Sequence, residues 1–397
     1  MLKQYFIAPI IALSMIACTN KGTTNTTENK ALTEADSIKL AMESISDDTS
    51  MYLLVGTYTS GESDGIYVYQ FDTISGYSKY VSMAKVDNPS YLAISKDEKF
   101  VYAVTENDDN TSAANALSFD KKDGKLKLLN TQLTGGGAPC YITVDRAGKH
   151  VVTANYLGAS ITLFNTNEDG TLAPASSVIS FMGKGVDERQ SQPHLHCVVF
   201  SPDEKYLFAS DLGTDKIHKF EVNDNSTEDF LKISTPPAFK IKDGSGPRHL
   251  EFHPNGKYAY LITELSGSVI AFEYNNGDLK EFQSIQADTL NAKGSGDIHI
   301  SPDGRFLYAS NRLKGDGLAI YSINQTDGKL TKVGYQDTGI HPRNFAITPN
   351  GKYLLVASRD NDIIQIFEID KKTGLLENVY KDIKLDMPVC LKFASFK

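Results

Sequence analysis

The chain has 397 residues, and its 40 Lys and Arg against 49 Asp and Glu give a formal net charge of −9 at pH 7. A surface with this balance repels nucleic acid and anionic membranes, and no cluster of basic residues reverses it, so a nucleic-acid partner is not expected. Hydrophobic residues make up 41% of the chain, which is enough for a large core, and frequent Tyr and Phe favour β-strands.

Residues 1–17 have the organisation of a signal peptide. Lys3 supplies positive charge, and the apolar stretch that follows is too short for a typical membrane span. The last residues, Met-Ile-Ala, precede Cys18 and resemble a bacterial lipobox, which predicts that Cys18 is lipidated and that the membrane is contacted only through this anchor. The alternative is an ordinary signal peptide followed by a chance cysteine. A cell-envelope location is therefore expected.

Residues 18–50 are rich in Thr, Asn, Ser, Lys and Glu, a composition typical of a flexible linker. Beyond this linker the chain has three cysteines, Cys140, Cys197 and Cys390. Each lies in an apolar segment, so we interpret all three as small buried hydrophobic residues. An odd number also leaves at least one thiol unpaired within a single chain.

One pattern recurs along the remaining chain: an apolar strand, a polar turn and a second apolar strand. Several turns combine Pro with Asn-Gly or Asp-Gly, which suits the backbone geometry of a tight turn. Successive turns end on a basic residue at intervals of 47 to 56 residues, a period that fits a four-stranded propeller blade. The six basic residues are Lys99, Lys149, Lys205, Lys257, Arg305 and Lys352.

A seventh repeat is divided between the two ends of the chain. Residues 387–393 resemble another first strand, and residues 52–56 and 65–69 supply the second and third strands that would follow it. We therefore predict an all-β fold over residues 51–397: a seven-bladed β-propeller of four-stranded antiparallel blades whose last blade is closed by N- and C-terminal strands. Such closure removes free sheet edges. Two separate β-domains would not explain the matched half-blades.

The start of each first strand and the end of each second strand share one face of a propeller. These points fall nine residues before and seven residues after the basic residue of each turn. The positions nine before are Ser90, Cys140, His196, Arg248, Gly296 and Arg343. The positions seven after are Glu106, Tyr156, Leu212, Glu264, Arg312 and Arg359. Ionisable side chains in a propeller interior are unusual unless they are paired or functional, so we expect a charged ring at one mouth of the central channel.

Two histidines fall near the same mouth. His194 and His196 are two residues apart, so in a strand they point the same way. His196 is the favoured general base or substrate ligand, because imidazole titrates near neutral pH. No third ligand with metal-site spacing accompanies the pair, and no metal is predicted. The alternative for the charged ring is that Glu264 pairs with Arg248 or Arg312 only to neutralise charge between blades.

Several motifs together resemble the lactonase family of seven-bladed propellers, which includes propeller-type 6-phosphogluconolactonases and fungal carboxy-muconate lactonising enzymes. The resemblance covers about residues 51–395. The motifs are Gly56-Thr57-Tyr58-Thr59, Gln192-Pro193-His194-Leu195-His196, Gly244-Ser245-Gly246-Pro247-Arg248-His249, Thr263-Glu264-Leu265, and Ile298-His299-Ile300-Ser301-Pro302-Asp303-Gly304-Arg305 followed by Ala309-Ser310-Asn311-Arg312.

The resemblance implies a site of one His, one Glu and two Arg, which His196, Glu264, Arg248 and Arg312 match. It also implies no cofactor and no metal, and a substrate that carries a carboxylate or phosphate. The expected reaction is hydrolysis of a sugar lactone, with 6-phosphogluconolactone favoured and 6-phosphogluconate as its product.

In this expected mechanism, water attacks the ring ester with His196 or Glu264 as the base. Arg248 and Arg312 bind the anionic group and the developing oxyanion. His194 and Arg343 are further candidates for substrate binding.

Three alternatives stay open at this stage. An export signal is unusual for an enzyme of a cytosolic sugar-phosphate route, so the protein would then act on a different sugar or carboxylated lactone. The second alternative is a non-catalytic propeller of the cell envelope that binds a ligand or a protein, because propellers host many unrelated functions. The third is a metal-dependent lactonase. The sequence predicts no particular oligomeric state.

Overall fold

The computed structural model describes residues 45–223 and 229–396. The predicted signal peptide, Cys18 and most of the predicted linker lie outside the described residues. Within them the chain is almost entirely β, and the two helices are the short 3-10 turns η1 (Asp47–Thr49) and η2 (Arg359–Asn361). No helix in this part of the chain is long and apolar enough to cross a membrane.

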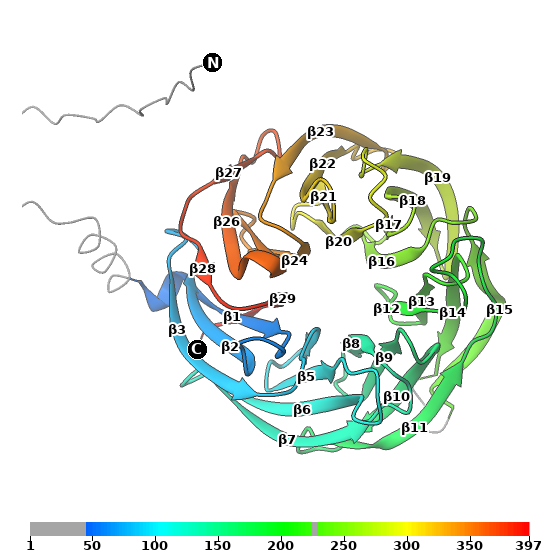
Figure 1. The fold of residues 1–397 in the computed structure, drawn as a ribbon, viewed down its shortest axis with the longest axis horizontal. Helices are drawn as coiled ribbons and strands as arrows, with labels where there is room; N and C mark the ends of the chain where they lie inside the picture. Colours follow the sequence, from blue (N-terminus) through cyan, green and yellow to red (C-terminus); the bar gives the residue numbers. More distant parts are fainter. Residues whose placement is uncertain (1–44, 224–228, 397) are drawn as a thin grey trace, which may run out of the picture. The chain divides into compact units, whose positions relative to one another are not determined.

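Seven antiparallel sheets surround a central axis (Figure 1). The innermost strands of neighbouring sheets contact one another in an unbroken cycle, so the ring is closed. The innermost strands are β4 (Leu92–Ile94), β8 (Pro139–Val144), β12 (Leu195–Phe200), β16 (Pro247–Phe252), β20 (Ser295–Ile300), β24 (Pro342–Ile347) and β29 (Pro388–Ser395). The second strands are β5 (Phe100–Thr105), β9 (His150–Asn155), β13 (Tyr206–Asp211), β17 (Tyr258–Thr263), β21 (Phe306–Asn311), β25 (Tyr353–Ser358) and β1 (Ser50–Thr57).

The outer half of each sheet completes the blade. The third strands are β6 (Ala113–Asp120), β10 (Ser160–Thr166), β14 (Lys216–Val222), β18 (Ser268–Asn275), β22 (Gly317–Ile323), β26 (Ile363–Ile369) and β2 (Gly65–Asp72). The outermost strands are β7 (Lys125–Leu133), β11 (Leu172–Ser180), β15 (Leu231–Lys240), β19 (Asp278–Gln286), β23 (Leu330–Asp337), β3 (Ser78–Lys85) and the pair β27 (Leu376–Asn378) and β28 (Ile383–Lys384). The prediction of a seven-bladed propeller with four-stranded blades is confirmed, and in one blade the outermost strand is divided in two.

One sheet differs from the simple pattern at its outer edge. Both β27 and β28 pair with β26, so this sheet has five strands. The segment between β27 and β28 contains Tyr380, whose φ of 54° is a left-handed conformation that an extended strand does not accommodate. The outer strand is therefore interrupted there.

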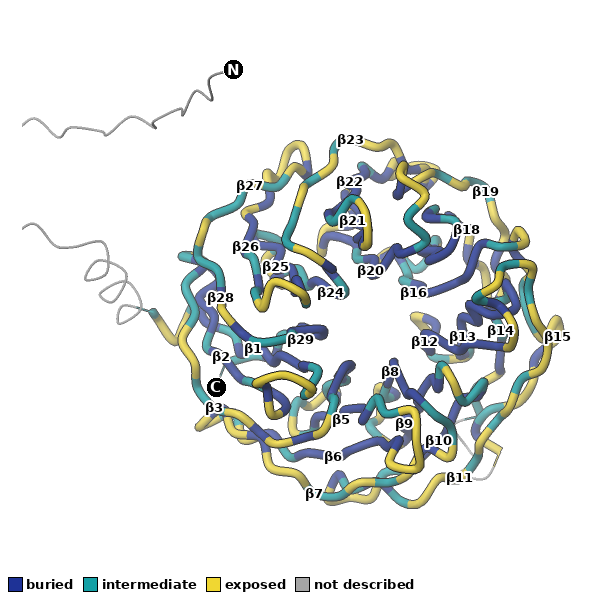
Figure 2. The backbone as a smooth tube through the Cα atoms, viewed as in Figure 1, coloured by how far each residue is buried: buried dark blue, intermediate teal, exposed yellow. Residues whose placement is uncertain are grey.

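Burial falls from the axis outwards (Figure 2). Every residue of β9, β21 and β25 is buried, because both faces of these strands pack against neighbouring blades, whereas the outermost strand β19 has one buried residue, Leu279. Neighbouring blades are also joined by tyrosine hydroxyls on second strands, each of which donates a hydrogen bond to a backbone carbonyl of the next blade. These bonds are Tyr52 to Lys121, Tyr102 to Gly170, Tyr258 to Thr326, Tyr260 to Gly328, Tyr308 to Gly374 and Tyr353 to Ile74.

The two ends of the described chain close the ring together. Strand β29 pairs antiparallel with β1, with Met51 opposite Ser395 and Gly56 opposite Cys390. The C-terminal strand thus becomes the innermost strand of a sheet whose other three strands come from the N-terminal side, as the divided seventh repeat predicts.

Candidate active site

The innermost strands share an irregularity near their first residues. In six of the seven sheets the register between the innermost and second strands shifts there, so one or two residues are left without a partner across the ladder. A bulge of this kind turns a side chain away from the position that the regular pleat would give it. The skipped residues are Cys140, His196, Arg248, Gly296 with Asp297, Arg343 and Val389.

Glu264 is the centre of a buried charge cluster. It directly follows β17, and one of its carboxylate oxygens lies 2.9 Å from Arg248 Nε and 3.2 Å from Arg312 Nη2. The other oxygen accepts a hydrogen bond from Arg189 Nη2. Arg248, Arg312 and Glu264 are 1%, 5% and 6% exposed. The structure therefore brings together three of the four residues predicted as catalytic.

The charges of this cluster depend on one another. Burial alone would raise the pKa of Glu264, but Arg312, Arg248 and Arg189 outweigh it and lower that pKa to about 2. Burial lowers the pKa of Arg312 to about 9, although Glu264 opposes this shift. At neutral pH Glu264 is thus a carboxylate bound by three cations, and it is a weak proton acceptor.

Arg189 is a member of this cluster that the sequence analysis missed. It lies in residues 181–194, the longest connection between an outermost strand and the next innermost strand. Counting from the turns reaches only strand ends, so it cannot find a residue in this loop. The unusual length of the loop and its charged stretch Asp187-Glu188-Arg189 were the available signals.

His196, the fourth predicted catalytic residue, lies against the same cluster but is not ion-paired. Its ring meets the rings of Tyr156 and His249 edge-on, with centroids 5.6 and 5.2 Å away. The side chain is buried, and its Nδ1 has no hydrogen-bond partner. Burial and the nearby Arg248 hold the pKa of His196 well below its usual value, so the imidazole is neutral at neutral pH.

The two residues predicted to assist substrate binding lie in different surroundings. His194 is 7% exposed and stacks on the ring of Tyr156 at 4.3 Å, and its Nδ1 lies 2.9 Å from the Tyr156 carbonyl oxygen. Arg343 pairs with Glu106 at 3.3 Å and lies over the ring of Tyr58. Arg343 therefore belongs to a second ion pair at the mouth.

Arg359 and Cys140, which the sequence analysis also placed in the charged ring, make contacts only within the protein. Arg359 pairs with Asp360 and bonds to His341, at the edge of the mouth. Cys140, Cys197 and Cys390 are buried, as predicted, and all three are free thiols; burial raises the pKa of each.

At the mouth as a whole, four arginines face two glutamates, which leaves an excess of positive charge. The arginines are Arg189, Arg248, Arg312 and Arg343, and the glutamates are Glu264 and Glu106. In residues 45–223 and 229–396, no group of three or more His, Cys, Asp or Glu side chains is arranged to hold a metal ion.

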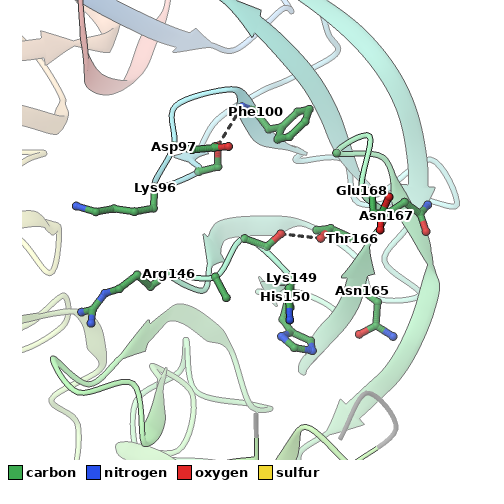
Figure 3. Close-up of a pocket in the computed structure, with 14 residues that line it drawn as sticks. Lys96, Asp97, Phe100, Arg146, Lys149, His150, Asn165, Thr166, Asn167 and Glu168 are labelled. Carbon is green, nitrogen blue, oxygen red and sulfur yellow. Dashed lines mark hydrogen bonds between the residues drawn. The ribbon is translucent and has the colours of Figure 1, made fainter. Parts of the chain in front are cut away.

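A separate pocket of about 830 Å³ lies between two blades at the opposite ends of their strands, away from the charged mouth. Its lining includes the turn before β5 and the turn before β9. Figure 3 shows Lys96 and Arg146 extending to the same side of it, with Asn165 and Glu168 across from them. None of the predicted site residues lines this pocket.

Comparison with known proteins places this geometry in a family. The family described as "Lactonase, 7-bladed beta-propeller" matches residues 52–393. A 6-phosphogluconolactonase of Formosa agariphila is 40% identical over 352 residues, which are 87% of this chain and 99% of the relative. A 6-phosphogluconolactonase of Bacillus subtilis is 39% identical over 347 residues, or 85% and 97% of the two chains.

Two solved structures are also similar. A Bacteroides fragilis protein is 59% identical with a TM-score of 0.86, covering 88% of this chain and 99% of its own. The periplasmic gluconolactonase of Pseudomonas aeruginosa is 34% identical with a TM-score of 0.83, covering 88% and 100%. The chain therefore belongs to the seven-bladed β-propeller lactonase family.

Proposed function

We propose that this protein hydrolyses the ring ester of a sugar lactone that carries an anionic group, with 6-phosphogluconolactone as the favoured substrate. The observation that carries this proposal is the excess of buried arginine at a mouth that also holds His196 with an unpartnered Nδ1. Arginine binds phosphate and carboxylate through its planar fork, and it also stabilises a developing oxyanion. Two family relatives are named 6-phosphogluconolactonases, which supports the same substrate.

In this mechanism His196 is the general base. Its imidazole is neutral at neutral pH, and Nδ1 makes no bond within the protein, so we assign Nδ1 as the acceptor of a proton from the attacking water. Because this atom is buried in the free protein, the mechanism requires that substrate binding open it to that water. The water oxygen bonds to the ester carbonyl carbon, and the carbon–oxygen bond of the ring then breaks. The imidazolium returns its proton to the ring oxygen, which gives a hydroxy acid.

Glu264 has a different role in the same mechanism. Both of its carboxylate oxygens already accept bonds from arginines, whereas His196 Nδ1 has no partner, so Glu264 holds the arginines in place and leaves the base role to His196. Arg248 and Arg312 both contact one of its carboxylate oxygens, and in this mechanism they bind the anionic group and the oxyanion. Arg343 and His194 complete the wall of the mouth, where Arg343 provides a further cation.

The test is acid release at neutral pH by the purified protein, after subtraction of spontaneous ring opening. 6-Phosphogluconolactone and gluconolactone are compared, together with His196→Ala and Glu264→Gln. We expect faster hydrolysis of the phosphorylated lactone, with kcat lowered about 100-fold in His196→Ala. Unchanged turnover in His196→Ala would remove His196 from the mechanism. No acceleration of any lactone by the folded protein would favour a ligand-binding propeller.

A second candidate is hydrolysis of an unphosphorylated sugar lactone outside the cytoplasm. Two observations favour it: the signal peptide predicted for residues 1–17, and the similarity to a periplasmic gluconolactonase. The same assay decides between the two substrates, since the preferred lactone has the higher kcat/KM.

The location is a proposal of its own, supported by the lipobox resemblance at Cys18. We propose that the protein is anchored in the cell envelope through a lipid on this cysteine. Cys18→Ser should move the protein from the membrane fraction to the soluble fraction and abolish incorporation of labelled fatty acid. Retention of both properties in the variant would contradict the anchor.

A further inference from the structure

A second group of residues, which we call the floor, lies next to the charged cluster on the innermost strands. Tyr141, His249 and Asn344 each follow a bulge position, Asp297 is itself a skipped residue, and Tyr91 directly precedes β4, where the register does not shift. The rings of Tyr91 and Tyr141 stack with centroids 4.0 Å apart, and His249 meets them edge-on at 5.9 and 5.2 Å. Asp297 and Asn344, 1% and 2% exposed, complete this floor.

A continuous series of polar contacts runs through the floor to the charged cluster. His249 Nε2 lies 3.2 Å from Arg248 Nη1, and His249 Nδ1 lies 2.6 Å from one oxygen of Asp297. The other Asp297 oxygen lies 2.9 Å from His299 Nε2, and it also accepts a hydrogen bond from the Asn344 amide. His299 Nδ1 in turn lies 2.6 Å from Glu251.

These contacts determine where the proton of His249 sits. A guanidinium only donates hydrogen bonds, so Nε2 of His249 must accept from Arg248. The proton of the neutral ring is then on Nδ1, from which it is donated to Asp297. Burial and Arg248 lower the pKa of His249 to about 3, so the ring is neutral at neutral pH. Asp297 therefore selects the tautomer that Arg248 requires.

The same contacts fix the direction of the Arg248 guanidinium. Nη1 donates to the Gly296 carbonyl oxygen at 2.8 Å as well as approaching His249, and Nε donates to Glu264 at 2.9 Å. Among the described residues no acceptor bonds to Nη2, which leaves this group for a substrate oxygen. The hydrogen bonds of Nε and Nη1 therefore fix the orientation of Nη2.

We propose that His249 and Asp297 are positioning residues that orient the Arg248 guanidinium towards the substrate. This inference rests on the proposed lactonase function for the role of Arg248. Neither residue contacts the reacting atoms in this account. Residues that orient a directly acting group through hydrogen bonds of this kind commonly change activity by about 10- to 100-fold.

Activity is the first test, with a matched control in the same floor. His249→Leu removes the contact to Arg248, whereas Tyr91→Phe keeps an aromatic ring against His249 and removes only a hydroxyl that bonds to Lys392. We expect kcat/KM to fall about 10- to 100-fold in His249→Leu, and Tyr91→Phe to retain most of its activity. Equal losses in both variants would mean that the floor matters only for stability.

A double-mutant cycle separates positioning from a general loss of structure. If His249 acts through Arg248, then His249→Leu adds little to the loss already caused by Arg248→Lys. Effects that multiply would show that the two residues act independently and would overturn the proposal. Thermal unfolding of each variant checks that the comparison is made on folded protein.

The third test does not depend on activity. Nitrogen-15 NMR of the histidine side chains, with His249 assigned from the signal missing in His249→Leu, reports its tautomer directly. We expect a neutral ring protonated on Nδ1 at pH 7, and a changed Nδ1 signal in Asp297→Asn. An Nε2-protonated ring or an imidazolium would overturn the inference, even in an active enzyme. An inactive wild-type protein with the expected tautomer would instead contradict the proposed function.

Discussion

Arg189 and Glu264 are 75 residues apart in the sequence and form an ion pair at the mouth of the channel. Arg189 is kept there by a second loop, because its Nη1 donates to the Lys293 carbonyl oxygen at 2.9 Å. The Lys293 ammonium also pairs with Asp187 at 2.7 Å. Two connections from different blades therefore meet beside Glu264, and one of them supplies a cation to the site.

Replacing Arg189 tests whether this loop takes part in the reaction. Arg189→Ala removes one of three cations from Glu264, so the pKa of Glu264 should rise and the anionic substrate should bind less tightly. We expect kcat/KM to fall about tenfold, measured with 6-phosphogluconolactone. Arg146→Ala is the control, since Arg146 is an exposed arginine at the opposite ends of the blades. Equal rates for the two variants would assign Arg189 a structural role only.

Glu264→Gln should destabilise the fold as well as slow the reaction. The pKa of Glu264 falls from 4.5 to about 2 on folding, a difference that contributes on the order of 3 kcal/mol. Because the folded pKa is the lower one, this contribution is present above pH 4.5 and is lost as the pH falls through 2. Urea unfolding at pH 7 measures it, with the exposed Glu281→Gln as control. A loss no larger than that of the control would contradict this account.

His299 should make the protein less stable in alkali. Burial opposes protonation of its ring, but Asp297 and Glu251 outweigh it and raise the pKa of His299 to about 10. A raised folded pKa contributes stability that is full below pH 6.5 and is lost as the pH rises through 10, at about 1.4 kcal/mol for each pKa unit. The free energy of unfolding should therefore fall between pH 7 and 10 more steeply in the wild type than in His299→Gln. Parallel curves would exclude this contribution.

Closure of the ring should depend on packing of the last strand. Leu391 on β29 is 1% exposed and lies opposite Val55 of β1. Leu391→Ala leaves a cavity where the two chain ends meet, and we expect a loss of about 2 to 5 kcal/mol. Leu128→Ala on the outermost strand β7 is the control, because Leu128 is 44% exposed. A similar unfolding midpoint for both variants would show that closure tolerates the cavity.

Activity should be insensitive to metal chelators. The proposed base is an imidazole and the proposed electrophilic groups are arginines, so no step requires a Lewis acid. Hydrolysis after exhaustive dialysis against EDTA should match that of the untreated protein. A loss that Zn²⁺ or Mg²⁺ restores would revive the metal-dependent alternative.

The blades were predictable because their signals are local. Each turn carries its own Pro, Asn, Asp or Gly, and the spacing of the basic residues after these turns reveals the repeat. Strand register then placed Arg248, Glu264 and Arg312 on one face, and the structure confirms that they touch. The divided seventh blade was predictable from the same pattern. Residues 387–393 supply its first strand, and residues 52–56 and 65–69 supply the second and third strands.

The missing parts of the site depend on contacts between distant segments. Arg189 reaches Glu264 from a loop that no repeat describes. The Asp297–His249 contact joins two blades and requires the register shifts of β16 and β20, which arise only when neighbouring strands pair. Counting from the turns placed Arg343 and Glu106 at the same mouth but could not show that they pair, because they are 237 residues apart and belong to non-adjacent blades.

The bulges on the innermost strands also bear on how this family can change its substrate. A bulged residue is not part of the strand ladder, so replacing its side chain alters the mouth while the blade keeps its hydrogen bonds. His196, Arg248 and Arg343 occupy such places, but Cys140, Gly296 and Val389 occupy equivalent ones with small or apolar groups. The propeller thus offers several positions around one axis where a new side chain would change the mouth without breaking the strand ladder. Gly296 is more restricted, because a Cβ there would lie 2.6 Å from Ser310 Oγ.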